Sequence, residues 1–262
     1  MKLSISNIGW GSQQDKAVYQ LMKKYGYSGL EIAPTRIFPE LPYTKLTEAE
    51  SWKKGLKSEY GFSVSSMQSI WFGRQEKLFS TENERKILIE YTKQAIDFAA
   101  VIGCENLVFG CPRNRFLFEN ADKSIAISFF RELGDYAEKK GTAIGMEANP
   151  VIYNTNYINH TRDALELIKE VDSKGFLLNL DIGTMIQNEE MCSVLDGSVH
   201  LINHVHISEP GLKPIKRRDI HIELKKMLLD QGYTKYISIE MGKIEDLSII
   251  DEKMQYVKGV FE

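Results

Sequence analysis

The chain has 262 residues, of which 43% are hydrophobic and 26% charged, with a formal net charge of −3. This composition is typical of a globular protein and excludes collagen-like and intrinsically disordered chains. No apolar run approaches the roughly 18 residues of a membrane-spanning helix, and the charge balance indicates no nucleic-acid partner.

The chain begins without the apolar stretch of a secretory signal peptide,. Its three cysteines, Cys104, Cys111 and Cys192, show no CxxC spacing, which argues against a disulfide framework or a thiolate zinc site,. We therefore expect a cytoplasmic protein without membrane contact.

Taken in chain order, eight short runs rich in strand-forming residues alternate with longer amphipathic stretches. The predicted strands cover residues 3–7, 29–33, 62–69, 106–110, 143–148, 176–182, 204–208 and 236–241. Apolar residues recur at helical spacing between them, most clearly in 82–103 and 122–141,. Glycine, the usual left-handed helix stop, follows several predicted helices. These glycines are Gly26, Gly61, Gly103, Gly141, Gly175 and Gly232.

Strands that alternate with helices predict βαβ units and a parallel sheet. Eight such units in a chain of this length match a single-domain (β/α)8 TIM barrel over residues 1–262,. The alternative is a doubly wound sheet, which would need a glycine-rich phosphate-binding turn after its first strand. Gly9 and Gly11 are followed by Ser12, Gln13 and Gln14, so the GxGxxG pattern fails,.

Four consecutive predicted strands end in a charged or imidazole side chain, although a strand buried on both faces should be apolar. These residues are Glu147, Asp181, His206 and Glu240, separated by 34, 25 and 34 residues, so there is one in each βα unit. In a closed barrel the carboxyl ends of neighbouring strands converge on the face where active sites are built. We therefore expect the four side chains to meet there.

Three carboxylates crowded together would raise one another's pKa values unless a cation were present. Three carboxylates and one imidazole form an oxygen-rich, mixed donor set. This set suits one divalent ion, with Mn²⁺, Mg²⁺ or Co²⁺ favoured and Zn²⁺ also compatible. His204 points to the same side of its strand as His206, and we favour His206 as the ligand because it lies nearer the carboxyl end.

With these residues the chain resembles the sugar phosphate isomerase/epimerase family, which has a xylose isomerase-like TIM barrel. The resemblance covers essentially the whole chain. It rests on Glu147 with Asn149-Pro150, Asp181-Ile182-Gly183, the segment 206–210, Gly232-Tyr233 and the segment 238–241. It implies that Glu147, Asp181, His206 and Glu240 bind one divalent cation. It further implies that Glu147 and Glu240 are the catalytic pair that exchanges the substrate proton.

The chain also departs from the family pattern. Thr184 stands where many members carry a substrate-holding histidine, and no arginine aligns after the histidine of the seventh strand. We expect His221 to substitute for the missing histidine. The other predicted substrate-binding residues are Asn149, Arg113, Arg115, Gln68 and Trp71.

The resemblance implies a metal-dependent isomerase or epimerase that acts on a sugar, keto-sugar or sugar phosphate through a cis-enediolate. A dehydratase of the same family would use the same intermediate. An endonuclease IV-like nuclease would need more than the five histidines present and a basic face. A non-catalytic sugar-binding barrel would leave costly buried carboxylates unused. The predicted partner is a small-molecule sugar or sugar phosphate, and the chain could be a monomer or a homo-oligomer.

Overall fold

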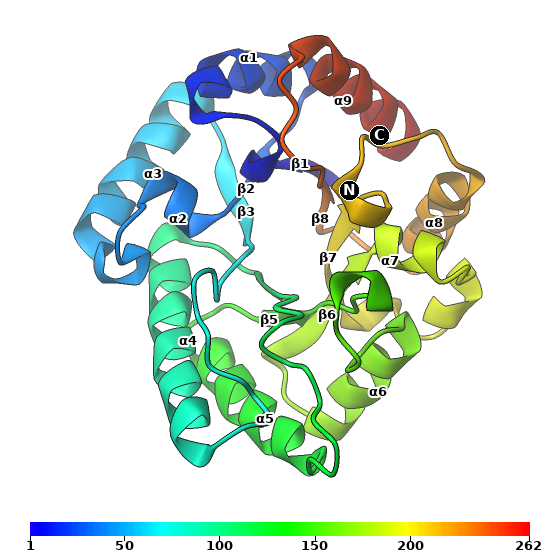
Figure 1. Cartoon of the computed structure of the whole chain (residues 1–262). Coiled ribbons are helices and arrows are strands. Elements are labelled where there is room, and N and C mark those ends of the chain that lie inside the picture. Colours follow the sequence, from blue (N-terminus) through cyan, green and yellow to red (C-terminus); the bar gives the residue numbers. More distant parts are fainter.

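Eight parallel strands close into a barrel in the order β1 to β8 in the computed structural model, which describes residues 1–262 (Figure 1). Strand β1 closes the ring by pairing with β8 as well as β2. The strands are β1 Lys2–Ser6, β2 Gly29–Ile32, β3 Ser63–Met67, β4 Leu107–Phe109, β5 Ile144–Met146, β6 Phe176–Asp181, β7 Ile202–Ile207 and β8 Tyr236–Ile239. The predicted single-domain (β/α)8 barrel is confirmed, and all eight predicted strands are present.

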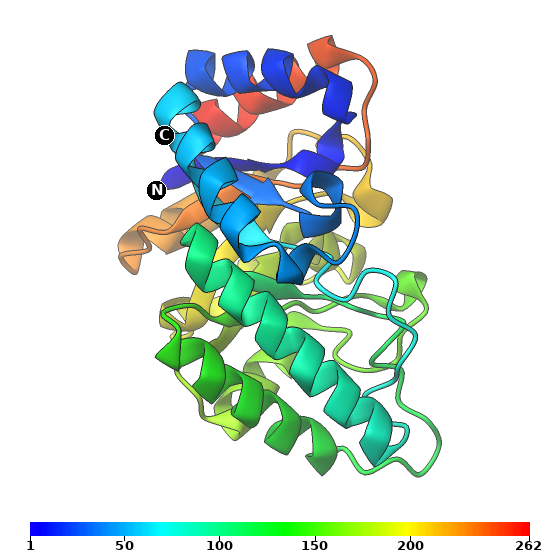
Figure 2. The ribbon, with the colours of Figure 1, turned by 90° about the vertical axis from the view of Figure 1, so that its left-hand side faces the viewer.

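Helices form an outer ring around the strands, and α4 packs beside α5 (Figures 1 and 2). They are α1 Asp15–Tyr25, α2 Pro34–Ile37, α3 Leu46–Tyr60, α4 Glu82–Ile102, α5 Ser124–Lys139, α6 Thr161–Val171, α7 Ile182–Gln187, α8 Asp219–Asp230 and α9 Leu247–Phe261. None of these helices has the length and apolar character needed to cross a membrane.

The predicted glycine stops are correct for most helices. Gly103, for example, ends α4 with a φ of 69°, where a side chain would be strained,. Gly175 is different, because α6 has already ended at Val171. A Cβ at Gly175 would overlap the backbone carbonyl of Gly134 in α5, so this glycine permits close packing.

The apolar core forms one continuous cluster of 67 buried residues. Inside the barrel, by contrast, several positions are polar and bond to one another. Asn106 donates to Ser66 Oγ at 2.9 Å, and Asn203 donates to Asn106 Oδ1 at 2.8 Å. Ser4 and Ser65 lie 2.5 Å apart through their hydroxyls. These bonds satisfy buried polar groups that would otherwise be costly.

Because all strands are parallel, the loops that follow them lie at one end of the barrel, on the right in Figure 2. The longest of these loops are residues 68–81, 110–123 and 147–160. Two register shifts interrupt the ladders, between Leu30 and Glu31 and between Leu178 and Asn179. Such bulges often redirect side chains beside active sites, and both occur next to the cluster described below.

Candidate metal centre

The structure brings together the four side chains predicted to bind metal. Glu147 and Glu240 follow β5 and β8, Asp181 ends β6, and His206 lies in β7. One potential ligand atom from each of the four lies within 4.8 Å of all the others. The shifted β6–β7 register places Asp181 beside His206, so the bulge helps to assemble the cluster.

His206 is the centre of this cluster. Its Nδ1 lies 3.0 Å from Glu147 Oε1 and 3.2 Å from Glu240 Oε2. Its Nε2 lies 2.8 Å from Glu31 Oε2. A carboxylate only accepts hydrogen bonds, so Nε2 carries a proton and Nδ1 faces the other carboxylates. Such an outer carboxylate commonly orients a metal-binding histidine.

Glu31, which is not among the predicted site residues, is also part of the site. It is fully buried, and the same oxygen lies 3.0 Å from Nε2 of His204. Gln68 donates to its other oxygen at 2.9 Å. A glutamate inside the predicted strand 29–33 was a signal, but it could equally have been polar filling of the barrel.

Asp181 is held by three donors. The Thr184 backbone N–H and hydroxyl each lie 2.8 Å from its Oδ2, and the Ser208 hydroxyl bonds to Oδ1. Asp181 is also the N-cap of α7. Thr184 therefore positions the Asp181 carboxylate.

Glu147 is oriented by two amides, with Asn179 donating to Oε1 at 2.8 Å and Asn149 donating to Oε2 at 3.1 Å. Behind it, Arg115 is fully buried and donates to the Glu147 carbonyl at 2.8 Å and to Asn149 Oδ1 at 3.0 Å. Arg115 therefore braces the end of β5, and its guanidinium does not face the cavity. Arg115 was predicted to bind substrate, and the structure places it behind the cavity and not in its lining.

The charges of the cluster are those that a divalent cation would balance. Burial, followed by the charge of Glu147, raises the pKa of Asp181. Burial raises the pKa of Glu240 to about 7. Burial opposes protonation of His206, but the charges of Glu240 and Glu31 outweigh it and raise the His206 pKa well above its usual value. Without a cation the cluster therefore retains protons, and its oxygen and imidazole donors fit a divalent metal ion.

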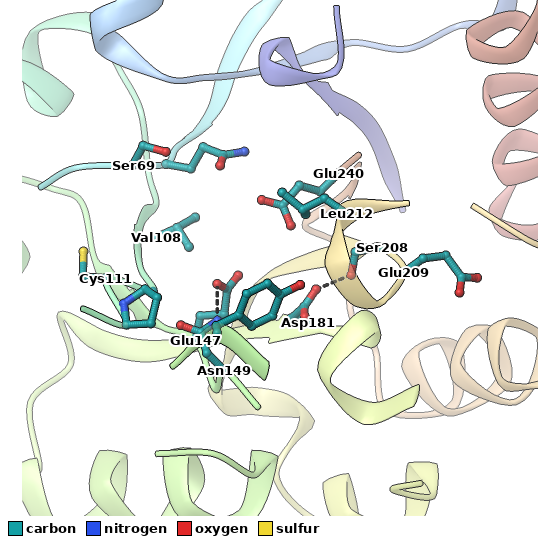
Figure 3. A pocket seen from close by; sticks show the side chains of 14 residues that line it. Ser69, Val108, Cys111, Glu147, Asn149, Asp181, Ser208, Glu209, Leu212 and Glu240 are labelled. Carbon is teal, nitrogen blue, oxygen red and sulfur yellow. Dashed lines mark hydrogen bonds between the residues drawn. The ribbon is translucent and has the colours of Figure 1, made fainter. Parts of the chain in front are cut away.

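The cluster opens into a cavity of about 180 Å³ (Figure 3). Of the predicted substrate-binding residues, Gln68 and Asn149 line this cavity. Tyr153, Glu209 and Leu212 also line it, and sequence reasoning did not select them. The other lining residues are Ser69, Val108, Gly110, Cys111, Pro112, Glu147, Asp181, Ser208 and Glu240.

Glu209 is paired rather than free. Arg218 donates to its two oxygens at 2.7 and 2.5 Å. Burial alone would raise the pKa of the Glu209 carboxyl, but the hydrogen bonds and the charge of Arg218 outweigh burial, so the pKa is lowered. This pair fastens the loop after β7 to the start of α8. Arg218 therefore compensates the negative charge of Glu209, which lines the cavity.

Besides Arg115, three predicted substrate-binding residues lie outside the cavity. His221 is fully buried in α8, with its Nδ1 2.8 Å from the Tyr256 hydroxyl, and burial lowers its pKa to about 4. The structure therefore does not bring His221 into the cavity, where it was expected to substitute for a substrate-holding histidine. Trp71 is buried and donates to Thr92 Oγ1 at 2.8 Å. Trp71 and the exposed Arg113 line a neighbouring hollow.

Solved structures with the same fold include sugar-converting enzymes. The crystal structure of D-psicose 3-epimerase from Clostridium cellulolyticum H10 matches with a TM-score of 0.79 and 17% identity over 100% of both chains. The 3-keto-D-glucoside 4-epimerase from E. coli matches with a TM-score of 0.77 and 18% identity over 99% of both chains.

The IOLI protein with a bound zinc atom matches with a TM-score of 0.73 and 18% identity, over 99% of this chain and 96% of that one. At these identities the similarity establishes a shared fold. No curated protein matches the chain in sequence. The sequence pattern of one family, described as the xylose isomerase-like TIM barrel, matches residues 19–259. The chain therefore belongs to the xylose isomerase-like TIM barrel family.

Proposed function

We propose that this protein is a divalent-metal-dependent isomerase or epimerase of a sugar or keto-sugar. One observation carries the proposal: the carboxylates of Glu147 and Glu240 lie 3.0 and 3.2 Å from the same His206 nitrogen, at the wall of one cavity. Two carboxylates that face one small space can exchange a proton with the same bound molecule.

In this proposal one glutamate removes a proton from carbon next to the substrate carbonyl, and the other returns a proton. Return to the neighbouring carbon gives isomerisation, and return to the opposite face of the same carbon gives epimerisation. Asp181 and His206 complete the donor set for the cation, which when bound supplies Lewis-acid stabilisation of the developing enediolate charge. Asn149 and Asn179 hold the Glu147 carboxylate in orientation.

The charge of the cavity favours a neutral sugar over a sugar phosphate. Its lining includes the carboxylates of Glu147, Asp181 and Glu240, together with that of Glu209, which is paired with Arg218, and no lysine, arginine or histidine. A phosphate or a nucleic-acid strand would meet no cationic side chain there. A barrel without catalysis gains nothing from a buried carboxyl group whose pKa is raised, as that of Glu240 is, whereas proton transfer uses such a group,.

Hydrogen–deuterium exchange at carbon tests the proposal. The Mn²⁺-loaded protein is incubated in D₂O with a panel of ketoses, aldoses and their phosphates, and exchange is followed by NMR. We expect exchange with a neutral sugar. Glu147→Gln and Glu240→Gln should each slow it by about 10²–10⁴-fold, the usual contribution of a general acid–base group.

The matched control is Glu223→Gln, which alters an exposed glutamate on α8 and should retain the rate. Product analysis in the same tubes distinguishes isomerisation, epimerisation and loss of water. Unchanged exchange in Glu240→Gln would contradict the role assigned to this residue.

A further inference from the structure

A second hollow, of about 220 Å³, lies beside the cavity of the metal cluster. The two spaces share Ser69, Cys111 and Pro112 as a common wall. Figure 3 shows Ser69 and Cys111 on the side of the cavity away from Asp181 and Ser208. A molecule bound at the cluster could therefore extend past this wall into the second hollow.

Phe72, in the wall of the second hollow, is held out toward solvent. Its side chain is 68% exposed, whereas the preceding Ile70 and Trp71 are buried. Tyr43 donates to the Ile70 carbonyl at 2.8 Å, and the Trp71 indole donates to Thr92 at 2.8 Å. The two residues that precede Phe72 are therefore anchored in the core, while the Phe72 ring is exposed.

The same hollow offers a hydrogen-bond donor. Arg113 lines it, is exposed and makes no ion pair. The cluster cavity contains no cationic side chain. An aromatic face beside a guanidinium suits a ring with a flat apolar face and polar edges, because aromatic rings stack and the guanidinium fork donates to oxygens. Neither Phe72 nor Arg113 lines the cluster cavity, and the proposed reaction does not use them.

We propose that this hollow is an outer subsite that binds a ring substituent, so that the substrate is a glycoside rather than a free monosaccharide. The proposal rests on the proposed function, since the inner ring is the sugar that reacts at the cluster. The substituent is either a second sugar or an aromatic aglycone. Both present a flat face to Phe72, and only the sugar presents several hydroxyls to Arg113.

Ligand-observed NMR titrations test the subsite without requiring turnover. The Mn²⁺-loaded protein is titrated with methyl and phenyl glycosides of gluco, galacto and manno configuration and with cellobiose and lactose. We expect at least one ring-substituted compound to bind about fivefold more tightly than its methyl glycoside, the scale of one aromatic contact. Phe72→Ala should remove this preference, and Phe72→Tyr should retain it.

Phe118→Ala is the matched control, because Phe118 is 44% exposed and lines neither hollow. It should leave every affinity unchanged. If the substituent is a second sugar, Arg113→Ala should lower the affinity for the disaccharides more than the affinity for the phenyl glycosides. If the substituent is an aromatic aglycone, Arg113→Ala should lower both affinities equally or leave both unchanged.

The subsite is overturned if no ring-substituted compound binds more tightly than its methyl glycoside, or if the preference persists in Phe72→Ala. Metal content is measured in the same samples. If the protein binds metal fully but no ring-substituted compound binds more tightly than its methyl glycoside, the subsite alone is refuted. If ring-substituted compounds bind more tightly but the protein binds no metal, the proposed function alone is refuted.

Discussion

Glu31→Gln should weaken metal binding, although Glu31 is outside the predicted set of ligands. The carboxylate lies 2.8 Å from His206 Nε2 and accepts from Gln68 at 2.9 Å. A glutamine oxygen can still accept from Nε2, so the imidazole keeps its tautomer, but the negative charge that makes it a better donor to a cation is lost. Outer partners of this kind contribute about 10–100-fold to metal affinity, equivalent to about 1.4–2.7 kcal/mol.

Isothermal titration of the metal-free protein with Mn²⁺ measures this effect directly. The Kd of Glu31→Gln should rise by about 10–100-fold, and that of the control Glu223→Gln should not change. Circular dichroism and thermal unfolding of the metal-free variants establish that the barrel is intact. A Glu31→Gln protein that is folded and binds Mn²⁺ as tightly as the wild type would refute the argument that Glu31 orients His206 for the cation.

Further predictions concern the ligands and the residues behind them. Asp181→Ala should bind no stoichiometric metal by elemental analysis, and full occupancy would contradict its assignment. In the metal-free cluster the pKa of Glu240 is raised to about 7 and that of His206 lies well above its usual value, so protons on both ligands compete with the cation. As the pH falls, the affinity for Mn²⁺ should decrease by up to about tenfold per pH unit for each proton that the metal displaces, with proton release visible in titrations in two buffers. Arg115→Met leaves the buried carbonyl of Glu147 unpaired and should cost about 1–3 kcal/mol in urea unfolding; an unchanged midpoint would contradict its bracing position. His221→Ala should lower the stability of the protein but leave its metal content and exchange rate unchanged. A tenfold loss of rate, about 1.4 kcal/mol, with the metal retained would instead support His221 as a substrate-binding residue.

Much of this fold could be read from local patterns. Strand-forming runs and helical spacing depend on near neighbours, so the alternation of elements predicted the closed barrel. The clustering of Glu147, Asp181, His206 and Glu240 followed as well, since parallel strands in a barrel place their carboxyl ends on one face. A charge at the end of a buried strand is costly alone, which made these four residues stand out.

The surroundings of other side chains depended on tertiary packing. Glu31 faces His206 from across the barrel, and its β2–β3 ladder changes register at this residue. Arg115 turns inward to backbone carbonyls, while Arg113, two residues earlier, remains exposed. His221 enters the core beside Tyr256. Such loops and buried contacts have no sequence period, because their conformations are set by partners distant in the chain, and only the folded barrel brings those partners together.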